Sequence, residues 1–150
     1  MGTVHKLVLN DFLEDNFELF AIHTTLDLYR VAYFLNRNLK LHLKYKQDID
    51  SFELFEYKNE QQQSIWNLVS NTGERIVTNN TTDTLVFEPE TTRIRTYLIP
   101  EHKNIDCFLK IENCQHNNNI ISKISKIPGV ITAFVINANQ LKSKNNLIFH

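Results

Sequence analysis

The sequence predicts an α+β fold in which two helices pack on one face of a largely antiparallel sheet. Two observations predict it. A strand–helix–strand pattern occurs near the front and again at the back of the chain, and between them apolar residues alternate with polar ones. Two helices cannot cover both faces of such a sheet, so we expect both on one face. With 150 residues, the chain is expected to form a single domain, 1–150, with a tail at about 140–150.

The clearest helix is expected near the front, after a buried strand. Mostly apolar side chains fill the segment FELFAIHT, Phe17–Thr24, as in a strand covered on both faces. In the segment TTLDLYRVAYFLNRNL that follows, Leu28, Val31 and Leu35 recur at the spacing of one helix face. A short strand, HKLVL, is expected before them at His5–Leu9.

The middle of the chain is expected to form antiparallel strands. Apolar and polar residues alternate in KLHLKYKQDID and again in SFELFEYKN, which predicts a hairpin around Gln47–Ser51. Further strands are predicted for SIWNLVSN and DTLVFEPE. The polar, turn-rich segment between them, NTGERIVTNNTTD, is expected to be a mobile loop.

The last third predicts strands, a helix and a final strand. The first strands are expected in RIRTYLIP and IDCFLKIEN, and then Ile120, Ile124 and Ile127 mark one helix face that ends at Pro128-Gly129. VITAFVINA predicts a buried strand, and the tail residues LIF are expected to dock on the body. The helix–Pro-Gly-Val–strand ending is similar to that of ACT domains. The fold is therefore expected to be ferredoxin-like or ACT-like with additional strands.

The composition excludes several classes of protein. The 16 basic and 17 acidic residues form no block of like charge, so neither a nucleic-acid-binding arm nor a membrane-binding tail is expected. Only two cysteines occur, the first residues lack the apolar core of a signal peptide, and no apolar run approaches the roughly 20 residues of a membrane helix, so we expect a cytoplasmic protein. The three glycines are far apart, so no phosphate-cradling loop and no cofactor are expected.

The segment TYLIPEHKNIDCFLKIE carries the most distinctive polar cluster. As an active site, Glu101 and Asp106 would form a carboxylate pair, with His102 as an acid–base catalyst or metal ligand. As a structural connection, Pro100 would end a strand because it has no N–H for the ladder, and the carboxylates would accept loop N–H groups. We favour the structural interpretation, because no second motif completes a triad. The protein is therefore not expected to be an enzyme, and no catalytic residue is assigned.

Metal and thiol chemistry are not expected either. Zinc ligands usually arrive as closely spaced pairs, but Cys107 and Cys114 are seven residues apart and the histidines are scattered. A nucleophilic Cys107 would need a histidine partner, for which His102 lies across the loop. A strand cysteine is more typically a small buried hydrophobic residue. His23, at the end of an apolar strand, is expected to be partly buried and hydrogen-bonded.

Aromatic residues offer one more alternative, a platform on which the bases of single-stranded RNA would stack. Trp66 and Tyr97 are candidates, and the run RIRTY, Arg93–Tyr97, comes nearest to the required mixture of basic and aromatic residues. This run lacks the Gly–aromatic pattern of an RNA-recognition motif. We therefore expect these aromatic side chains in the core.

The polar cluster resembles the signature of the bacterial IPExxxVDY family. The likeness extends along the chain through HKLVLNDF, AIHTTLDLYRVAYFLN, WNLVSN and NQLKSKNNLIF. The family has no established activity, so the resemblance implies a bacterial protein without implying a reaction. Within the signature, the chain matches at Ile99, Pro100, Glu101 and Asp106, and it has Ile105 in place of Val and Cys107 in place of Tyr. A position that takes either Tyr or Cys is expected to be a packing site.

The leading hypothesis is a non-enzymatic binding, adaptor or regulatory module. It would act through protein–protein contacts of its sheet face or edges, with an unidentified partner protein or by self-association. One alternative is an ACT-like sensor of a small molecule. Another is an RNA-associated protein or a hydrolase that uses Glu101, His102 and Asp106. No membrane or nucleic-acid partner is expected, whereas a small-molecule ligand is allowed for.

Overall fold

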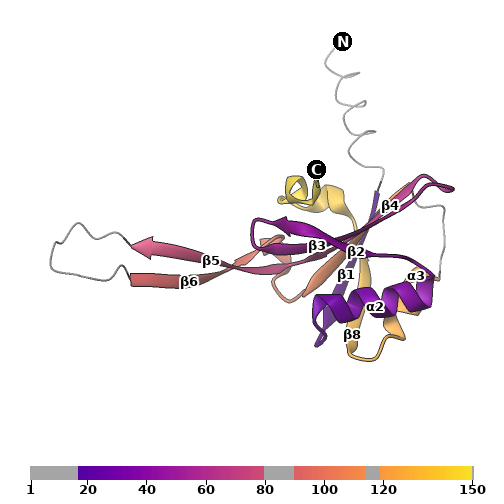
Figure 1. The fold of residues 1–150 in the computed structure, drawn as a ribbon, viewed down its shortest axis with the longest axis horizontal. Helices are drawn as coiled ribbons and strands as arrows, with labels where there is room; N and C mark the ends of the chain where they lie inside the picture. Colours follow the sequence, from indigo (N-terminus) through magenta and orange to yellow (C-terminus); the bar gives the residue numbers. More distant parts are fainter. Residues whose placement is uncertain (1–16, 80–89, 114–118, 150) are drawn as a thin grey trace, which may run out of the picture.

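The protein is built around a six-stranded antiparallel sheet. The structure, a computed structural model, describes residues 17–79, 90–113 and 119–149. In these residues the large sheet has the strand order β2-β3-β4-β7-β1-β8, and β5 and β6 form a separate two-stranded sheet that extends to one side as an arm (Figure 1). Every strand pairs antiparallel to its neighbours.

The described elements follow one another in a simple order. The strands are β1 (Phe17–Thr24), β2 (Lys44–Ile49), β3 (Phe52–Asn59), β4 (Ser64–Ser70), β5 (Thr72–Asn79), β6 (Glu90–Tyr97), β7 (Cys107–Glu112) and β8 (Val130–Ile136). The helices are α2 (Leu28–Leu39) and α3 (Ile120–Ser125), and short 3₁₀ turns occur at η1 (Pro100–His102), η2 (Ala138–Gln140) and η3 (Lys144–Leu147). Among these, no helix combines the length and apolar composition that crossing a membrane requires.

One face of the large sheet packs against α2 and α3. Side chains alternate between the faces of a strand, so Leu109 of the central strand β7 points toward the helices while Phe108 points away from them. Val31 and Leu35 of α2 and Ile124 of α3 are fully buried in this layer. The apolar face of each helix therefore packs against the sheet and, with it, forms the first of two hydrophobic cores.

The opposite face of the sheet carries a second core. Phe108, Leu54 and Val69 are completely buried there, beneath the connection between β6 and β7 and the C-terminal segment. Leu147 of η3 is also fully buried. The C-terminal segment lies on the side of the sheet away from α2 (Figure 1). Both faces of the sheet are thus largely covered.

The expected ferredoxin-like or ACT-like fold is wrong: α2 and α3 cover one face of the large sheet, but a second core lies on its other face and a separate two-stranded sheet is added. The described chain is dominated by eight strands in two antiparallel sheets, and it is α+β only in the broad sense of containing both elements. The segment expected to be a mobile loop, NTGERIVTNNTTD, instead supplies β5, which pairs with β6 from Thr72–Tyr97 to Asn79–Glu90. Its Ile76-Val77-Thr78 run is β-branched and favours a strand, but the partner strand β6 lies too far along the chain for the local sequence to reveal it.

Of the individual elements expected from the sequence, some are confirmed, one is wrong in its burial, and two lie outside the described residues. The strand Phe17–Thr24 and the helix beginning at Leu28 are confirmed, and the LIF segment does dock through Leu147. The expected burial of VITAFVINA is wrong, because β8 lies at the edge of the sheet with Ile131 and Val135 each 59% exposed. The strands expected at His5–Leu9 and in DTLVFEPE lie outside the described residues, except for the final Glu, which begins β6.

Candidate functional site

The distinctive polar cluster forms the connection between β6 and β7, organised around one buried asparagine. Asn71, between β4 and β5, is completely inaccessible to solvent. Its side-chain amide donates to the carbonyl oxygens of His102 and Ile105, each at 2.8 Å, and its Oδ1 accepts from the Ile99 N–H at 2.8 Å. A single side chain therefore ties the start, middle and end of the connection together.

The backbone of Asn71 bonds to the same connection. Its N–H donates to the Asp106 carbonyl at 2.9 Å, and its carbonyl accepts from the Leu98 N–H at 3.0 Å. Together with the side-chain bonds, these contacts satisfy every polar group of a residue that has no access to water. Hydrogen bonds from one residue, Asn71, therefore fix the backbone of the connection both where it leaves β6 and where it enters β7.

Glu101 reaches away from this connection to the C-terminal segment. Its Oε1 accepts from the Ser143 hydroxyl at 2.6 Å and its Oε2 from the Ser143 N–H at 3.0 Å. The hydrogen bond from the Ser143 hydroxyl is the main reason that the pKa of the Glu101 carboxyl lies below its ordinary value; partial desolvation opposes it, and backbone N–H groups lower the pKa further. Glu101 therefore fastens the tail to the β6–β7 connection.

Asp106 bonds instead to the end of β1. Its Oδ2 accepts from His23 Nδ1 at 2.7 Å and from the Thr24 N–H at 2.8 Å. The Asp106 N–H donates to the Ile22 carbonyl at 3.0 Å, which adds a third bond to the same strand. The side chains of His23 and Asp106 are 41% and 43% exposed, so their pair lies at the surface.

The residues predicted as an active site do not converge on one point. Glu101 bonds to the tail and Asp106 to β1, while His102 contributes its backbone carbonyl to the Asn71 amide. His23, Glu101 and His102 line a shallow cavity of about 470 Å³ beside β8, but Asp106 is not among its lining residues. The two carboxylates thus join segments distant in sequence, in place of the loop N–H groups expected from their positions.

The His23–Asp106 pair has the geometry in which a carboxylate orients a histidine for proton transfer. The Cys107 thiol is not within reach of His23, because Cys107 points into the helix-side core, whereas His23 follows the inward-facing Ile22 and projects from the opposite face. Burial raises the pKa of the Cys107 thiol above its ordinary value, with the Asp106 charge adding to the effect. This cysteine is a packing residue, as its position at a strand start predicted.

Metal binding finds no support in the described part of the chain. No group of three or more His, Cys, Asp or Glu side chains there is arranged to hold an ion. The His23–Asp106 pair offers only two candidate ligands, whereas zinc sites use three or four protein ligands. Cys114 and His116 lie outside the described residues.

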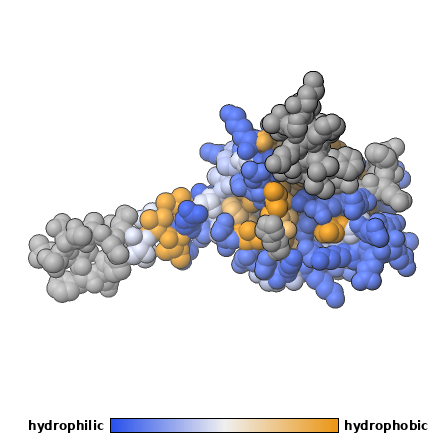
Figure 2. Space-filling model, turned by 90° about the horizontal axis from the view of Figure 1, so that it is seen from above, coloured by the Kyte–Doolittle hydropathy of each residue, from blue (hydrophilic) through white to orange (hydrophobic). Residues whose placement is uncertain are grey.

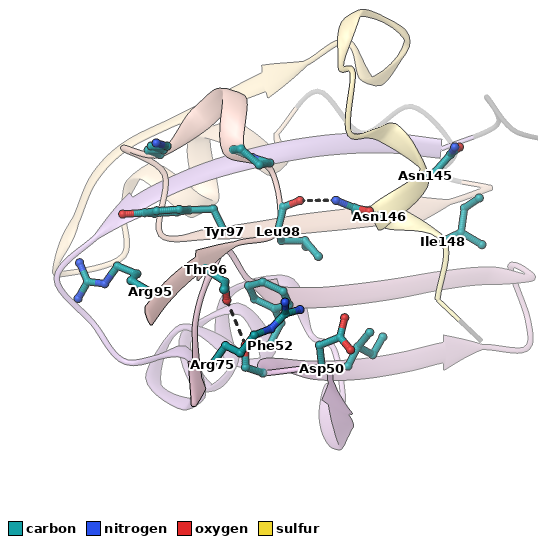
Figure 3. A pocket seen from close by; sticks show the side chains of 14 residues that line it. Asp50, Phe52, Arg75, Arg95, Thr96, Tyr97, Leu98, Asn145, Asn146 and Ile148 are labelled. Carbon is teal, nitrogen blue, oxygen red and sulfur yellow. Dashed lines mark hydrogen bonds between the residues drawn. The ribbon is translucent and has the colours of Figure 1, made fainter. Parts of the chain in front are cut away.

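A second cavity, which the sequence did not predict, lies where the arm meets the body. It has a volume of about 570 Å³ between the base of the β5–β6 arm, the β2–β3 turn and the C-terminal segment. Figure 3 shows Tyr97 and Phe52 along its wall, with Asn146 donating to the Leu98 carbonyl, a bond of 2.8 Å. Its charged lining residues are Asp50, Arg75, Arg95 and Lys103.

Sequence reasoning also missed a buried lysine in the second core. Lys110, on β7, is 4% exposed, and its ammonium donates to the Leu147 carbonyl at 2.7 Å and to Glu112 Oε1 at 3.0 Å. The ammonium also lies 4.7 Å from the ring centre of Phe17 and 5.1 Å from that of Phe149. A lysine between apolar residues in a predicted central strand, CFLKIE, was the available signal.

Comparisons of the chain with protein-family models, with curated proteins and with solved structures each found no match. The resemblance of the β6–β7 connection to the IPExxxVDY signature therefore stays a prediction.

Replacing Asn71 with alanine is expected to destabilise the protein severely. The change leaves the Ile99 N–H and the Ile105 carbonyl without their partner, while the His102 carbonyl keeps its bond from the Ile105 N–H. Each buried polar group left unpaired costs about 1–3 kcal/mol, so we expect a loss of about 2 kcal/mol or more. Equilibrium urea denaturation at neutral pH measures it.

Two further variants test the cause of that loss. Asn71→Asp keeps an acceptor for Ile99 but sets a carboxylate against two carbonyl oxygens, so we expect a loss at least as large. Asn104→Ala removes an exposed amide from the same connection and is expected to change stability by no more than about 0.5 kcal/mol. Equal midpoints for Asn71→Ala and Asn104→Ala would refute the role of Asn71.

The hydrogen bond between Glu101 and Ser143 is expected to show in a titration. Because the pKa of Glu101 is lowered in the folded state, its contribution to stability is complete above the ordinary glutamate pKa of about 4.3 and is lost as the pH falls through the lower folded value. NMR of the carboxyl carbon measures that pKa. Ser143→Ala should raise it toward the ordinary value, and Ser125→Ala, at the end of α3, should not. An unchanged midpoint in Ser143→Ala would contradict the assignment.

Proposed function

We propose that the protein is a cytoplasmic, non-enzymatic module that works by binding another protein through its β5–β6 arm. The observation that carries the proposal is that the arm extends away from the body as a two-stranded ribbon (Figure 1). An isolated two-stranded ribbon is marginally stable in water, because it has no core of its own. A partner that covers the arm would supply the missing contacts.

The arm meets the body closely at its base. A side chain at Gly73 would collide with Ser51, and the Ser51 hydroxyl lies 3.2 Å from that of Thr96. Beyond this base, Ile76 and Ile94 are 64% and 46% exposed, and Figure 2 shows an apolar patch part-way along the arm. The arm is therefore anchored at one end and bears apolar side chains further out.

Both faces of the arm combine an isoleucine with an arginine. Residues directly opposite in an antiparallel pair share a face, so Ile94 lies with Arg75 on one face and Ile76 with Arg93 on the other. A ribbon that is apolar on both faces suits insertion into a cleft. The arginines outnumber Glu74 among the side chains described on the arm, so the fitting partner is a protein cleft with apolar walls and acidic rims.

The proposal predicts site-specific cross-links. A photo-reactive amino acid placed at Ile76, and separately at Ile94, is expected to give the same single adduct in cells, because one cleft encloses both faces. The same amino acid at Tyr33, an exposed position on α2, should not give it. Adduct masses on denaturing gels and by mass spectrometry identify the partner.

Charge reversal tests the chemistry of that contact. Arg75→Glu together with Arg93→Glu should abolish the adduct, since acidic rims would repel the new charges, while Arg30→Glu on α2 should leave it intact. All of these residues are exposed, so circular dichroism should show an unchanged fold. The proposal is wrong if the arm positions give no adduct, or if Tyr33 gives the same one.

A second candidate function, binding of a small organic anion, is favoured by the cavity at the base of the arm. Its volume of about 570 Å³ is within the usual range of about 300–1,000 Å³ for ligand sites. Arg75, Arg95 and Lys103 outnumber Asp50 on its walls, and the Lys103 ammonium lies 5.5 Å from the ring centre of Tyr97. Nucleotides and acidic amino acids have the matching charge.

A thermal-shift panel of amino acids and nucleotides tests this candidate. A ligand at 100 times its Kd stabilises the folded state by about 2.7 kcal/mol, which is readily measured. Arg75→Gln should abolish the shift, whereas Arg93→Gln, on the other face of the arm and not among the lining residues, should retain it. A flat response across the panel would exclude ligands of these two classes.

A further inference from the structure

The helix layer of the fold comes from two stretches of the chain that contain no acidic residue. All 17 aspartates and glutamates of the sequence lie outside residues 28–47 and 113–150. The first stretch contains α2 and the second contains α3. Cations in the last turn of a helix are favoured by the helix dipole, but that preference does not account for the lack of any carboxylate along both stretches. The charged side chains of the two helices are therefore all positive.

Three cations surround one groove between the helices. α2 and α3 lie side by side on the sheet (Figure 1), and Asn38 Nδ2 on α2 lies 3.5 Å from the Lys123 carbonyl oxygen on α3. The groove beside this contact has a volume of about 390 Å³. Three cations, one amide and two apolar residues line it: Arg37, Lys123, Lys126, Asn38, Phe34 and Pro128. The groove therefore combines apolar walls with positive charge, and no carboxylate is among its described lining residues.

The three cations have no counter-charge of their own. None of them forms an ion pair with a carboxylate in the residues that the structure describes. Arg37 and Lys126 are exposed and Lys123 is half-buried, so their charged groups are open to a ligand. Like charges gathered around one groove repel one another, and a negatively charged partner offsets that repulsion. The groove is therefore complementary to an anion.

The apolar walls of the groove and the charge of the whole chain favour a protein as the source of that anion. Phe34 is half-buried, packs against the helix-side core and lines the groove together with Pro128, so the groove suits an apolar side chain set between negative charges. Domains that bind nucleic acid are typically strongly basic, whereas this chain has a net charge of −1. Clusters of basic residues are a recurring means of binding acidic segments of proteins.

We infer that the groove between α2 and α3 binds an acidic segment of a partner protein, in which one apolar side chain lies between carboxylates. The apolar side chain packs on Phe34 and Pro128, and the carboxylates pair with Arg37, Lys123 and Lys126. No residue of the β5–β6 arm lines this groove, so the inference and the proposed function can fail independently.

A synthetic peptide is the probe for this groove. It consists of aspartates and glutamates around one central phenylalanine and carries a fluorescent label, and its anisotropy is followed as the full chain is added. We expect binding that weakens as salt is added, because salt screens exposed charges. The same peptide with asparagine and glutamine in place of its acidic residues should not bind, and a version with glycine in place of phenylalanine should bind more weakly. Failure of the acidic peptide to bind at low salt would overturn the inference.

Charge-neutral variants assign the binding to the groove. Arg37→Gln, Lys123→Gln and Lys126→Gln should each weaken binding about twofold to fivefold, the usual effect of one exposed ion pair, and the triple variant should abolish it. Urea denaturation should give the triple variant a midpoint no lower than that of the original chain, because three like charges no longer repel one another. A lower midpoint with peptide binding retained would assign the cations to helix stability and refute the site.

A second triple variant separates the groove from the net charge of the chain. It removes three exposed cations from the arm and should leave peptide binding unchanged: Arg75→Gln, Arg93→Gln and Arg95→Gln. Equal loss of binding in both triple variants would show that the groove is not the site. Tighter binding of a single-stranded RNA with the same charge as the peptide would overturn the choice of a protein partner.

Discussion

The hydrogen bonds of Asn71 are the constraint on which the second face of the sheet depends. They fix the β6–β7 connection, from which Glu101 holds the tail and Asp106 holds the end of β1. The Ile105 carbonyl and the Ile99 N–H are buried and have this side chain as their partner, whose loss costs about 1–3 kcal/mol for each group. A typical domain has a total stability of about 5–15 kcal/mol. The loss expected on removing this one amide is therefore a large fraction of the free energy that keeps the layer folded. The hydrogen bonds of Asn71 fix the path of the β6–β7 connection, and the apolar side chains of the second core pack beneath that connection.

The parts of the fold that the sequence predicted are those set by local periodicity. The helix α2 repeats apolar residues every three or four positions, and β1 is a nearly unbroken apolar run, so both could be placed. The overall packing could not, because strand order is decided by pairing between distant segments. VITAFVINA has the composition of a buried strand, yet it lies at an edge with exposed side chains. The strand β5 was missed because its polar residues suit a ribbon exposed on both faces as well as they suit a loop.

The candidate site was predictable in its residues but not in its contacts. The cluster around Glu101 and Asp106 stood out because a proline and two carboxylates lie between apolar strands. Their partners, Ser143 and His23, are far away in sequence, and no local pattern points to them. Asn71 gave no signal beyond that of a turn residue, since asparagine before Thr-Gly is common in turns. Its importance follows from complete burial, which is a property of the assembled chain.

The position of β1 has a consequence for how the protein is made. This apolar strand is the first described element to leave the ribosome, yet both strands that flank it in the sheet, β7 and β8, come from the last third of the chain. Its backbone groups stay without their native strand partners for most of synthesis, and long-range pairing of this kind is slow even after release. During that interval FELFAI is an exposed, aggregation-prone segment. The nascent chain is therefore a natural client for chaperones that shield apolar strands, and its folding is completed only when the last third has emerged.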